Sequence, residues 1–206
     1  MKNTLLGLLT LVASFNVFAQ TGEEFFTANC VACHGEQGNS LAASFPKLAG
    51  QNAKYLIKQI NDFKSGARVN GLMVAPMAAL PDEMINEVAQ YLSKQNPSIG
   101  SAKADLVELG QMLYKAGNIE TGVPACSACH SPTGKGNAPG GIPMLSGQHA
   151  GYVESQLYAY RLGARDESAS DSVRVNDGDT KIMRSIAFKL KDFEIEAVAS
   201  YINGLH

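Results

Sequence analysis

The chain has 206 residues, of which 45% are hydrophobic and 17% are charged, and its formal net charge at pH 7 is -2. This length suits one or two domains, and the composition is typical of a globular protein and unlike that of a disordered one. The nearly balanced charge gives no basic surface of the kind that nucleic-acid-binding proteins carry, so we expect no nucleic-acid partner.

Residues 1–19 have the pattern of a secretory signal peptide. Lys2 supplies a positive charge, residues 5–12 form a short apolar segment, and residues 17–19 resemble a cleavage site, so we expect cleavage after Ala19. The alternative is an uncleaved anchor, but the apolar run is shorter than the about 20 residues that a membrane-spanning helix needs. We therefore expect an exported mature chain without a transmembrane span.

The rest of the chain is predicted to consist of helices and loops, because it shows apolar residues at helical spacing and no strand-like alternation of any length. In chain order, the predicted helices cover residues 22–28, 53–65, 81–94, 104–115, 150–162 and 192–203. Glycine-rich and polar segments predict loops at residues 35–44 and 131–142. The sequence therefore predicts an all-α protein.

A stretch rich in proline, glycine and serine at residues 95–103 predicts a linker between two domains, which we place at residues 20–97 and 98–206. The two domains are copies of each other. FPKLAGQ, which begins at Phe45, aligns with IPMLSGQ, which begins at Ile142, at an offset of 97. The closing helices align at an offset of 110, so the second copy has 13 extra residues. A shared Gly-Ala-Arg segment, ending at Arg68 and Arg165, places all of them after Arg165.

Every cysteine of the chain lies in one of two C-x-x-C-H motifs, which are Cys30-Val31-Ala32-Cys33-His34 and Cys126-Ser127-Ala128-Cys129-His130. This spacing is typical of c-type haem attachment, in which the two thiols bond to haem vinyl groups and the histidine ligates the iron. The sequence therefore predicts two covalent haem c groups. A small domain with few helices also needs the apolar mass of a buried haem to complete its core. The predicted attachment residues are Cys30, Cys33, Cys126 and Cys129, and the predicted iron ligands are His34 and His130.

Two other interpretations of the cysteines are a disulfide within each motif and a zinc site. Export permits disulfides, but a disulfide between the two cysteines of one motif would be of the redox-active kind. It would also leave both adjacent histidines unexplained. A zinc site is the second alternative, but the two motifs are 96 residues apart and lack the ligand spacing of a zinc finger.

The second axial ligand of each iron is predicted to be a methionine. At the offset of 110, Met73 aligns with Met183, whereas Met77 aligns with Ala187. A thioether ligand favours ferrous iron and suits an electron carrier. We therefore predict Met73 and Met183 as ligands, with Met77 as the alternative for the first haem. The other role open to each methionine is packing in the hydrophobic core.

Further repeated residues have candidate supporting roles. The carbonyl groups of Pro46 and Pro143 could accept the second ring N–H of the ligating histidines, although ordinary turns explain these prolines equally well. Two tyrosines and two arginines that repeat could hold haem propionates, or the tyrosines could pack helices and the arginines could be solvated at helix ends. They are Tyr55, Tyr152, Arg68 and Arg165. His149 and His206 have no histidine at the aligned position, and we expect both at the surface.

Together these segments make the chain resemble the cytochrome c4 family, the diheme class I c-type cytochromes. The resemblance rests on the C-x-x-C-H motifs, on the two segments at residues 45–51 and 142–148, and on NDGD at residues 176–179 leading to IMRSIA at residues 182–187. It implies two tandem cytochrome c domains with His/Met ligation, and haems that face each other across the domain interface. The loop from Arg68 to Met73 is shorter here than in relatives of the family.

The resemblance also implies the function. It predicts a periplasmic electron carrier whose irons cycle between Fe(III) and Fe(II) without catalysing a reaction on a substrate. A quinol-oxidising complex or another cytochrome is the expected donor, a terminal cytochrome c oxidase is the expected acceptor, and peripheral association with the membrane is compatible with both. The competing class is an enzyme, either a diheme peroxidase or a haem subunit of a dehydrogenase. A peroxidase needs an open or displaceable sixth iron site, which the paired methionines argue against.

Overall fold

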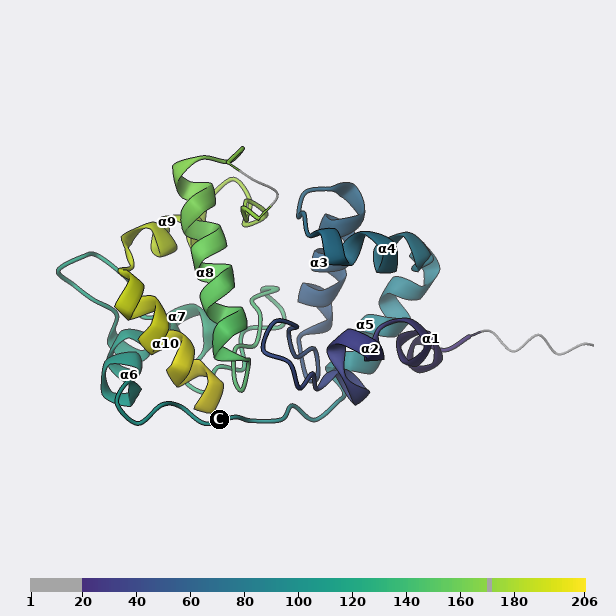
Figure 1. The fold of residues 1–206 in the computed structure, drawn as a ribbon, viewed down its shortest axis with the longest axis horizontal. Coiled ribbons are helices and arrows are strands. Elements are labelled where there is room, and N and C mark those ends of the chain that lie inside the picture. Colours follow the sequence, from purple (N-terminus) through teal and green to yellow (C-terminus); the bar gives the residue numbers. More distant parts are fainter. Residues whose placement is uncertain (1–19, 170–171) are drawn as a thin grey trace, which may run out of the picture.

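The computed structural model describes residues 20–169 and 172–206, so the expected signal peptide lies outside the described part. The described residues fold into two helical domains that lie side by side (Figure 1). They contain no strand beyond two isolated β-bridges, Asn118 with Val123 and Asn137 with Ile142. None of the described helices is long and apolar enough to cross a membrane.

The first domain contains five α-helices and two short 3-10 turns. In order, they are α1 (Gly22–Asn29), α2 (Val31–His34), the 3-10 turn Glu36–Gly38, α3 (Ala53–Ser65), α4 (Gly71–Ala79), the 3-10 turn Asp82–Met84 and α5 (Ile85–Ser93). Helix α1 begins at a capping box, in which the side chains of Thr21 and Glu24 bond each other's backbone N–H groups. Its two phenylalanines, Phe25 and Phe26, enter a core formed with α3, α4 and α5.

The second domain repeats this plan. Its helices are α6 (Val107–Ala116), α7 (Ser127–His130), α8 (Ala150–Arg165), α9 (Ile182–Lys189) and α10 (Asp192–Gly204). Buried residues from α6, α8, α9 and α10 form its core. The segment at residues 96–103, which has no regular structure, joins α5 to the second domain and runs along the lower edge of the molecule in Figure 1.

One helix crossing is built in the same way in both domains. A Cβ atom on Gly22 of α1 would lie 2.3 Å from the backbone of Glu87 in α5, and a Cβ on Gly110 of α6 would lie 2.3 Å from the backbone oxygen of Ala197 in α10. Glu87 and Ala197 are aligned residues of the two repeats. Glycine is thus required at the crossing in each domain, because only its hydrogen leaves room for the backbones to touch.

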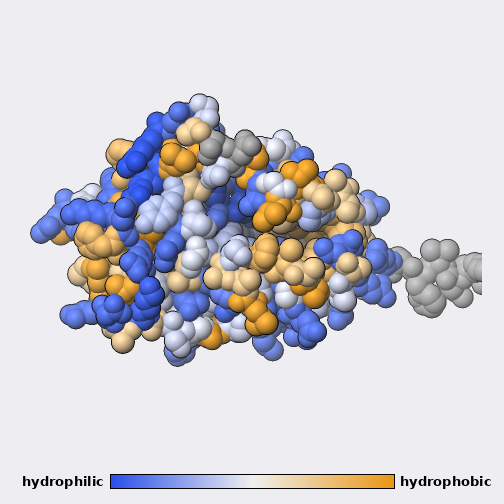
Figure 2. Space-filling view, viewed as in Figure 1, coloured by the Kyte–Doolittle hydropathy of each residue, from blue (hydrophilic) through white to orange (hydrophobic). Residues whose placement is uncertain are grey.

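Each of the six predicted helical segments is helical in the structure, whereas α4 and α9 were not predicted. Helix α4 contains Pro76 and lacks an amphipathic pattern, and α9 is only eight residues long. Both carry the methionines predicted as ligands. Much of α4 is exposed, including Leu72 and Val74, which are 71% and 65% exposed. Figure 2 shows hydrophobic residues gathered over this side of the first domain.

Candidate haem-binding sites

The first C-x-x-C-H motif forms one helical turn that follows α1 directly. The backbone N–H of His34 donates to the Cys30 carbonyl at 3.0 Å, which closes the turn and places the histidine beside the anchoring cysteines. His34 is buried, and its Nδ1 lies 2.9 Å from the Pro46 carbonyl oxygen. Because a carbonyl oxygen can only accept, Nδ1 carries the proton and Nε2 carries the lone pair.

The second motif has the same geometry. His130 is buried on α7, and its Nδ1 lies 2.9 Å from the Pro143 carbonyl oxygen. Of the two roles left open for Pro46 and Pro143, the structure shows the one in which the proline carbonyl accepts the histidine N–H, and it does so in both domains. Burial lowers the pKa of His34 and His130 below the ordinary value, although these hydrogen bonds oppose the shift. Both rings are thus neutral imidazoles with a fixed tautomer, which is the form that ligates a metal.

All four cysteines lie in the described part of the chain, and none of them forms a disulfide. Burial raises the pKa of Cys30 and of Cys126 to about 11, so both are protonated thiols at neutral pH. The described residues also contain no cluster of three or more His, Cys, Asp or Glu side chains that could hold a metal ion. Neither a structural disulfide nor a zinc site therefore receives support, whereas free thiols beside a tautomer-fixed histidine fit a covalently attached haem.

The methionines predicted as ligands lie in the same cores as the cysteines. Met73 and Cys30 pack against the core of the first domain, and Met183 and Cys126 pack against that of the second. Met73 and Met183 are both partly buried, near the start of α4 and of α9, respectively. Met77 lies four residues further along α4 and is only 7% exposed, like its aligned residue Ala187, which is fully buried. Met77 and Ala187 thus share a buried position of the repeat.

A cluster of polar side chains lies between the domains, where it joins α3 to α8. The Nη2 atom of Arg68 donates to the Tyr152 hydroxyl at 3.0 Å and to the Gln156 side chain at 2.8 Å. The Nη2 atom of Arg174 donates to the Tyr55 hydroxyl and the Gln59 side chain, both at 3.0 Å. Since Tyr55 aligns with Tyr152, and Gln59 with Gln156, Arg174 is the structural counterpart of Arg68.

Of the two roles left open for Arg165, the structure favours that of a solvated arginine at a helix end. Arg165 is exposed at the end of α8, while Arg174 is buried in the interface. The sequence Arg-Val-Asn, which begins at both Arg68 and Arg174, shows that nine of the extra residues precede Arg174 and only the remainder follow it. The Gly-Ala-Arg match at Arg165 hid this second alignment. A search of the extra segment for Arg-Val-Asn would have found it.

Positive charge exceeds negative charge in this interdomain cluster. Asp62 is the only carboxylate in its hydrogen-bond network among the described residues, and it pairs with Lys58, next to the two arginines. Burial alone would raise the pKa of Tyr55, but the charges of Arg174 and Arg68 outweigh it and hold that pKa below its ordinary value. A partly buried excess of cations suits anionic groups such as carboxylates.

His149 also joins the two domains, so its expected placement at the surface is wrong. Its Nε2 lies 2.9 Å from the Ser40 carbonyl oxygen and 3.0 Å from the Ser40 hydroxyl. Its aligned residue Asn52 likewise reaches across the interface, where it donates to the Ile142 carbonyl at 2.6 Å. His206 is exposed, as expected.

Comparisons with known proteins agree with this arrangement. A family model described as cytochrome c matches residues 19–96 and 107–206. A cytochrome c4 of Azotobacter vinelandii is 47% identical, with 87% of this chain and 85% of the relative covered. The crystal structure of reduced recombinant cytochrome c4 from Pseudomonas stutzeri superposes with a TM-score of 0.82 at 42% identity, covering 90% of this chain and 97% of that one. A thiosulfate dehydrogenase electron acceptor of Stutzerimonas stutzeri is 37% identical, with 96% of this chain and 92% of the relative covered.

Proposed function

Because the chain belongs to the cytochrome c family, and within it to the diheme cytochromes c4, we propose that it carries electrons between periplasmic proteins of a respiratory chain. Its cofactors are two covalently bound haem c groups, one in each of its tandem cytochrome c domains. Each haem supplies a one-electron Fe(III)/Fe(II) couple when bound. The observation that carries the proposal is the pair of buried histidines, each with Nδ1 held at 2.9 Å by a proline carbonyl.

The cysteines and histidines have matching roles in the two domains under this proposal. Cys30 and Cys33 hold the first haem through thioether bonds, and Cys126 and Cys129 hold the second. The short helices α2 and α7 then present His34 and His130 as iron ligands through Nε2. The hydrogen bond at Nδ1 orients each ring and increases its basicity as a ligand.

Met73 and Met183 serve as the opposite ligands under this proposal. Their support is the shared repeat position, the matched location near the start of α4 and α9, and the partial burial against the cores that also contact Cys30 and Cys126. Met77 is the alternative for the first haem. A thioether at the sixth position favours Fe(II) and leaves no open site for a substrate, which suits a carrier better than an enzyme.

The interdomain cluster suits the negatively charged propionate groups of the haems. We assign Arg68 and Arg174, together with Tyr55 and Tyr152, as the residues that neutralise them. A guanidinium group binds a carboxylate through two parallel hydrogen bonds, and both arginines lie where the two domains meet. This assignment replaces Arg165 by Arg174, and it is consistent with two haems that face the same interface.

The proposed donor is a quinol-oxidising complex or another cytochrome, and the proposed acceptor is a terminal cytochrome c oxidase. A second candidate role is to accept electrons from a periplasmic dehydrogenase, which the similarity to a thiosulfate dehydrogenase electron acceptor favours. The location is the periplasm, after removal of residues 1–19 by cleavage following Ala19. Stopped-flow reduction of the ferric holoprotein by membranes with quinol, or by thiosulfate dehydrogenase with thiosulfate, separates the two donors.

The ligand assignments are tested by potentiometric titration of the holoprotein and of three variants, Met73→Ala, Met77→Ala and Met183→Ala. We expect Met73→Ala and Met183→Ala each to lower the reduction potential of one haem and to remove half of the red charge-transfer band that sulfur bonded to ferric iron produces. Met77→Ala should leave both potentials near those of the parent protein. If Met77→Ala altered the first haem while Met73→Ala did not, the assignment in α4 would be wrong.

A further inference from the structure

The residue that follows Met183 is fixed by a buried ion pair. The Nε atom of Arg184 donates to Asp177 Oδ1 at 2.7 Å, and both side chains are 5% exposed. The backbone N–H of Arg184 donates to the other carboxylate oxygen of Asp177 at 2.9 Å. One carboxylate therefore holds both the main chain and the side chain of the residue next to Met183.

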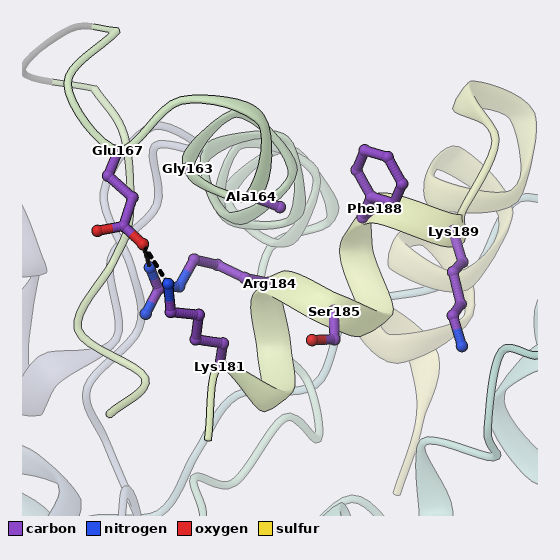
Figure 3. Close-up of a pocket in the computed structure, with 8 residues that line it drawn as sticks. All are labelled: Gly163, Ala164, Glu167, Lys181, Arg184, Ser185, Phe188 and Lys189. Atoms are coloured by element: carbon purple, nitrogen blue, oxygen red, sulfur yellow. Dashed lines mark hydrogen bonds and ion pairs between the residues drawn. The ribbon is translucent and has the colours of Figure 1, made fainter. Parts of the chain in front are cut away.

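The other donors of Arg184 extend this attachment. Its Nη1 pairs with Glu167, which lies just beyond the end of α8, and its Nη2 donates to the Gly178 carbonyl at 3.3 Å. Lys181 also donates to Glu167, at 2.7 Å. In Figure 3, Arg184 and Lys181 converge on Glu167 from the beginning of α9. The start of α9 is thus tied both to the preceding loop and to the segment after α8.

The backbone just before α9 adopts a conformation that needs such support. Lys181 has φ 50 and ψ 35, in the left-handed region that residues other than glycine rarely enter. Its side chain does not cap the helix. Asp177 takes that role instead, by accepting the N–H of the third helical residue, Arg184. Strained backbone persists only where surrounding contacts determine it, and the Asp177–Arg184 pair supplies those contacts.

The first domain has no equivalent of this pair. The residue that follows Met73 is Val74, which is 65% exposed, and α4 contains no charged residue. The start of α4 is capped by the neutral side chain of Asn70, which accepts the Leu72 N–H at 2.9 Å. The start of α4 is therefore held by this exposed cap and by the bond from the Met73 N–H to the Asn70 carbonyl at 2.9 Å, whereas the start of α9 is held by a buried ion pair with several hydrogen bonds.

We propose that the Asp177–Arg184 pair is a positioning device that keeps the Met183 sulfur bound to the second haem iron, and that the first haem is the one whose methionine is displaced by an added ligand. This inference rests on the ligand roles proposed above for Met73 and Met183. An external ligand must move the sulfur off the iron before it can bind. Moving Met183 requires distortion of a helix start held by the buried Asp177 carboxylate, whereas moving Met73 requires distortion of an exposed helix start that only neutral hydrogen bonds hold.

The test is an imidazole titration of the ferric holoprotein, followed at each haem through its paramagnetically shifted methyl signals in NMR spectra. Met73→Ala and Met183→Ala proteins assign the signals to the two haems. We expect imidazole to bind the first haem at least tenfold more tightly than the second. Asp177→Asn should raise the affinity at the second haem at least tenfold and leave that at the first haem unchanged.

Two further variants make the result specific. Asp177→Asn with Arg184→Val removes both charges together and copies Val74, so no unpaired buried charge threatens folding, and the same gain is expected. Asp192→Asn breaks another ion pair of the second domain, with Arg161 at 2.6 Å, and should leave the imidazole affinities unchanged. If the imidazole affinity of the second haem stayed within twofold of the parent value in both Asp177 variants, this inference would be overturned, while the proposed ligand roles would stand. If Met183→Ala kept the full charge-transfer band, the ligand assignment would fall and this inference with it.

Discussion

Gln51 and Gln148 occupy the same position in the two repeats, and each binds both backbone groups of one residue in the opposite domain. Gln51 accepts the N–H of Met144 at 2.8 Å and donates to its carbonyl at 2.9 Å. Gln148 makes the same two contacts with Lys47, both at 2.9 Å. Lys47 and Met144 are themselves aligned residues of the repeats. The two glutamines therefore make the same pair of hydrogen bonds across the interface, one from each domain to the other.

These paired hydrogen bonds predict the effect of replacing the donor nitrogen of either glutamine. Gln51→Glu puts an oxygen in place of the donor nitrogen, so the Met144 carbonyl loses its partner and faces a negative charge. We expect the free energy of unfolding to fall by about 2–3 kcal/mol, and Gln148→Glu to behave alike, because both side chains are buried. Guanidinium denaturation of the holoproteins measures this free energy. Gln90→Glu is the control, since Gln90 is exposed on α5. If Gln51→Glu lowered the free energy of unfolding no more than Gln90→Glu, the hydrogen bonds of Gln51 would not stabilise the interface.

The two candidate arginines of the second domain predict opposite outcomes. Arg174→Ala removes donors to Tyr55, Gln59 and Gln156 inside the interface, so the free energy of unfolding should fall by about 2–3 kcal/mol. Arg165→Ala changes an exposed side chain and should alter that free energy by less than about 0.5 kcal/mol. Thermal unfolding of the two variant holoproteins measures both changes. Equal losses would contradict the assignment of Arg174 as the counterpart of Arg68.

His149 predicts a dependence of stability on pH. Partial burial and the nearby Lys47 charge lower the pKa of His149 below its ordinary value of 6.5, although the bond to Ser40 opposes this. The folded state therefore binds the proton less tightly than the unfolded state. The contribution of His149 to stability is present above pH 6.5 and is lost as the pH falls from that value through the lower folded pKa.

His149→Asn provides the measurement, because asparagine is the residue at the aligned position 52 and does not titrate. The melting temperature of the parent holoprotein should drop further than that of the variant when the pH is lowered from about 7.5 to about 5.5. Identical drops in the two proteins would show that His149 does not contribute to the pH dependence of the domain contact.

The residue after each haem-motif histidine predicts a difference between the domains. Gly35 has φ 74, and a Cβ there would lie 2.3 Å from the Asn39 carbonyl oxygen, whereas Ser131 holds a similar φ of 67 in the second domain. Gly35→Ser should therefore cost about 2 kcal/mol or more of stability, measured by thermal unfolding of the holoprotein. Gly71→Ser is the control, because a Cβ at Gly71 meets nothing within 4 Å. Equal stability of the two variants would show that the turn after His34 tolerates a side chain.

The helical domains and the repeat could be predicted, because local spacing encodes them. The contacts of His34 and His130 with the proline turns were one of two possibilities, because spacing alone does not separate a hydrogen-bond acceptor from an ordinary turn. The roles of Arg174 and His149 could not be predicted, because they depend on how the two domains pack. Arg174 lies in the segment that breaks the repeat, and a short Gly-Ala-Arg match at Arg165 concealed its alignment with Arg68. His149 does not resemble Asn52 chemically, yet both reach across the same interface.

We propose that both domains hold a haem with histidine and methionine ligands and that the protein carries electrons without acting on a substrate. The most direct measurement is combined electron paramagnetic resonance and near-infrared magnetic circular dichroism of the ferric holoprotein, with spins counted per chain. We expect two low-spin centres, both with a sulfur-to-iron charge-transfer band, and no rapid reaction with hydrogen peroxide. A high-spin centre in either domain that reacts rapidly with peroxide would contradict it.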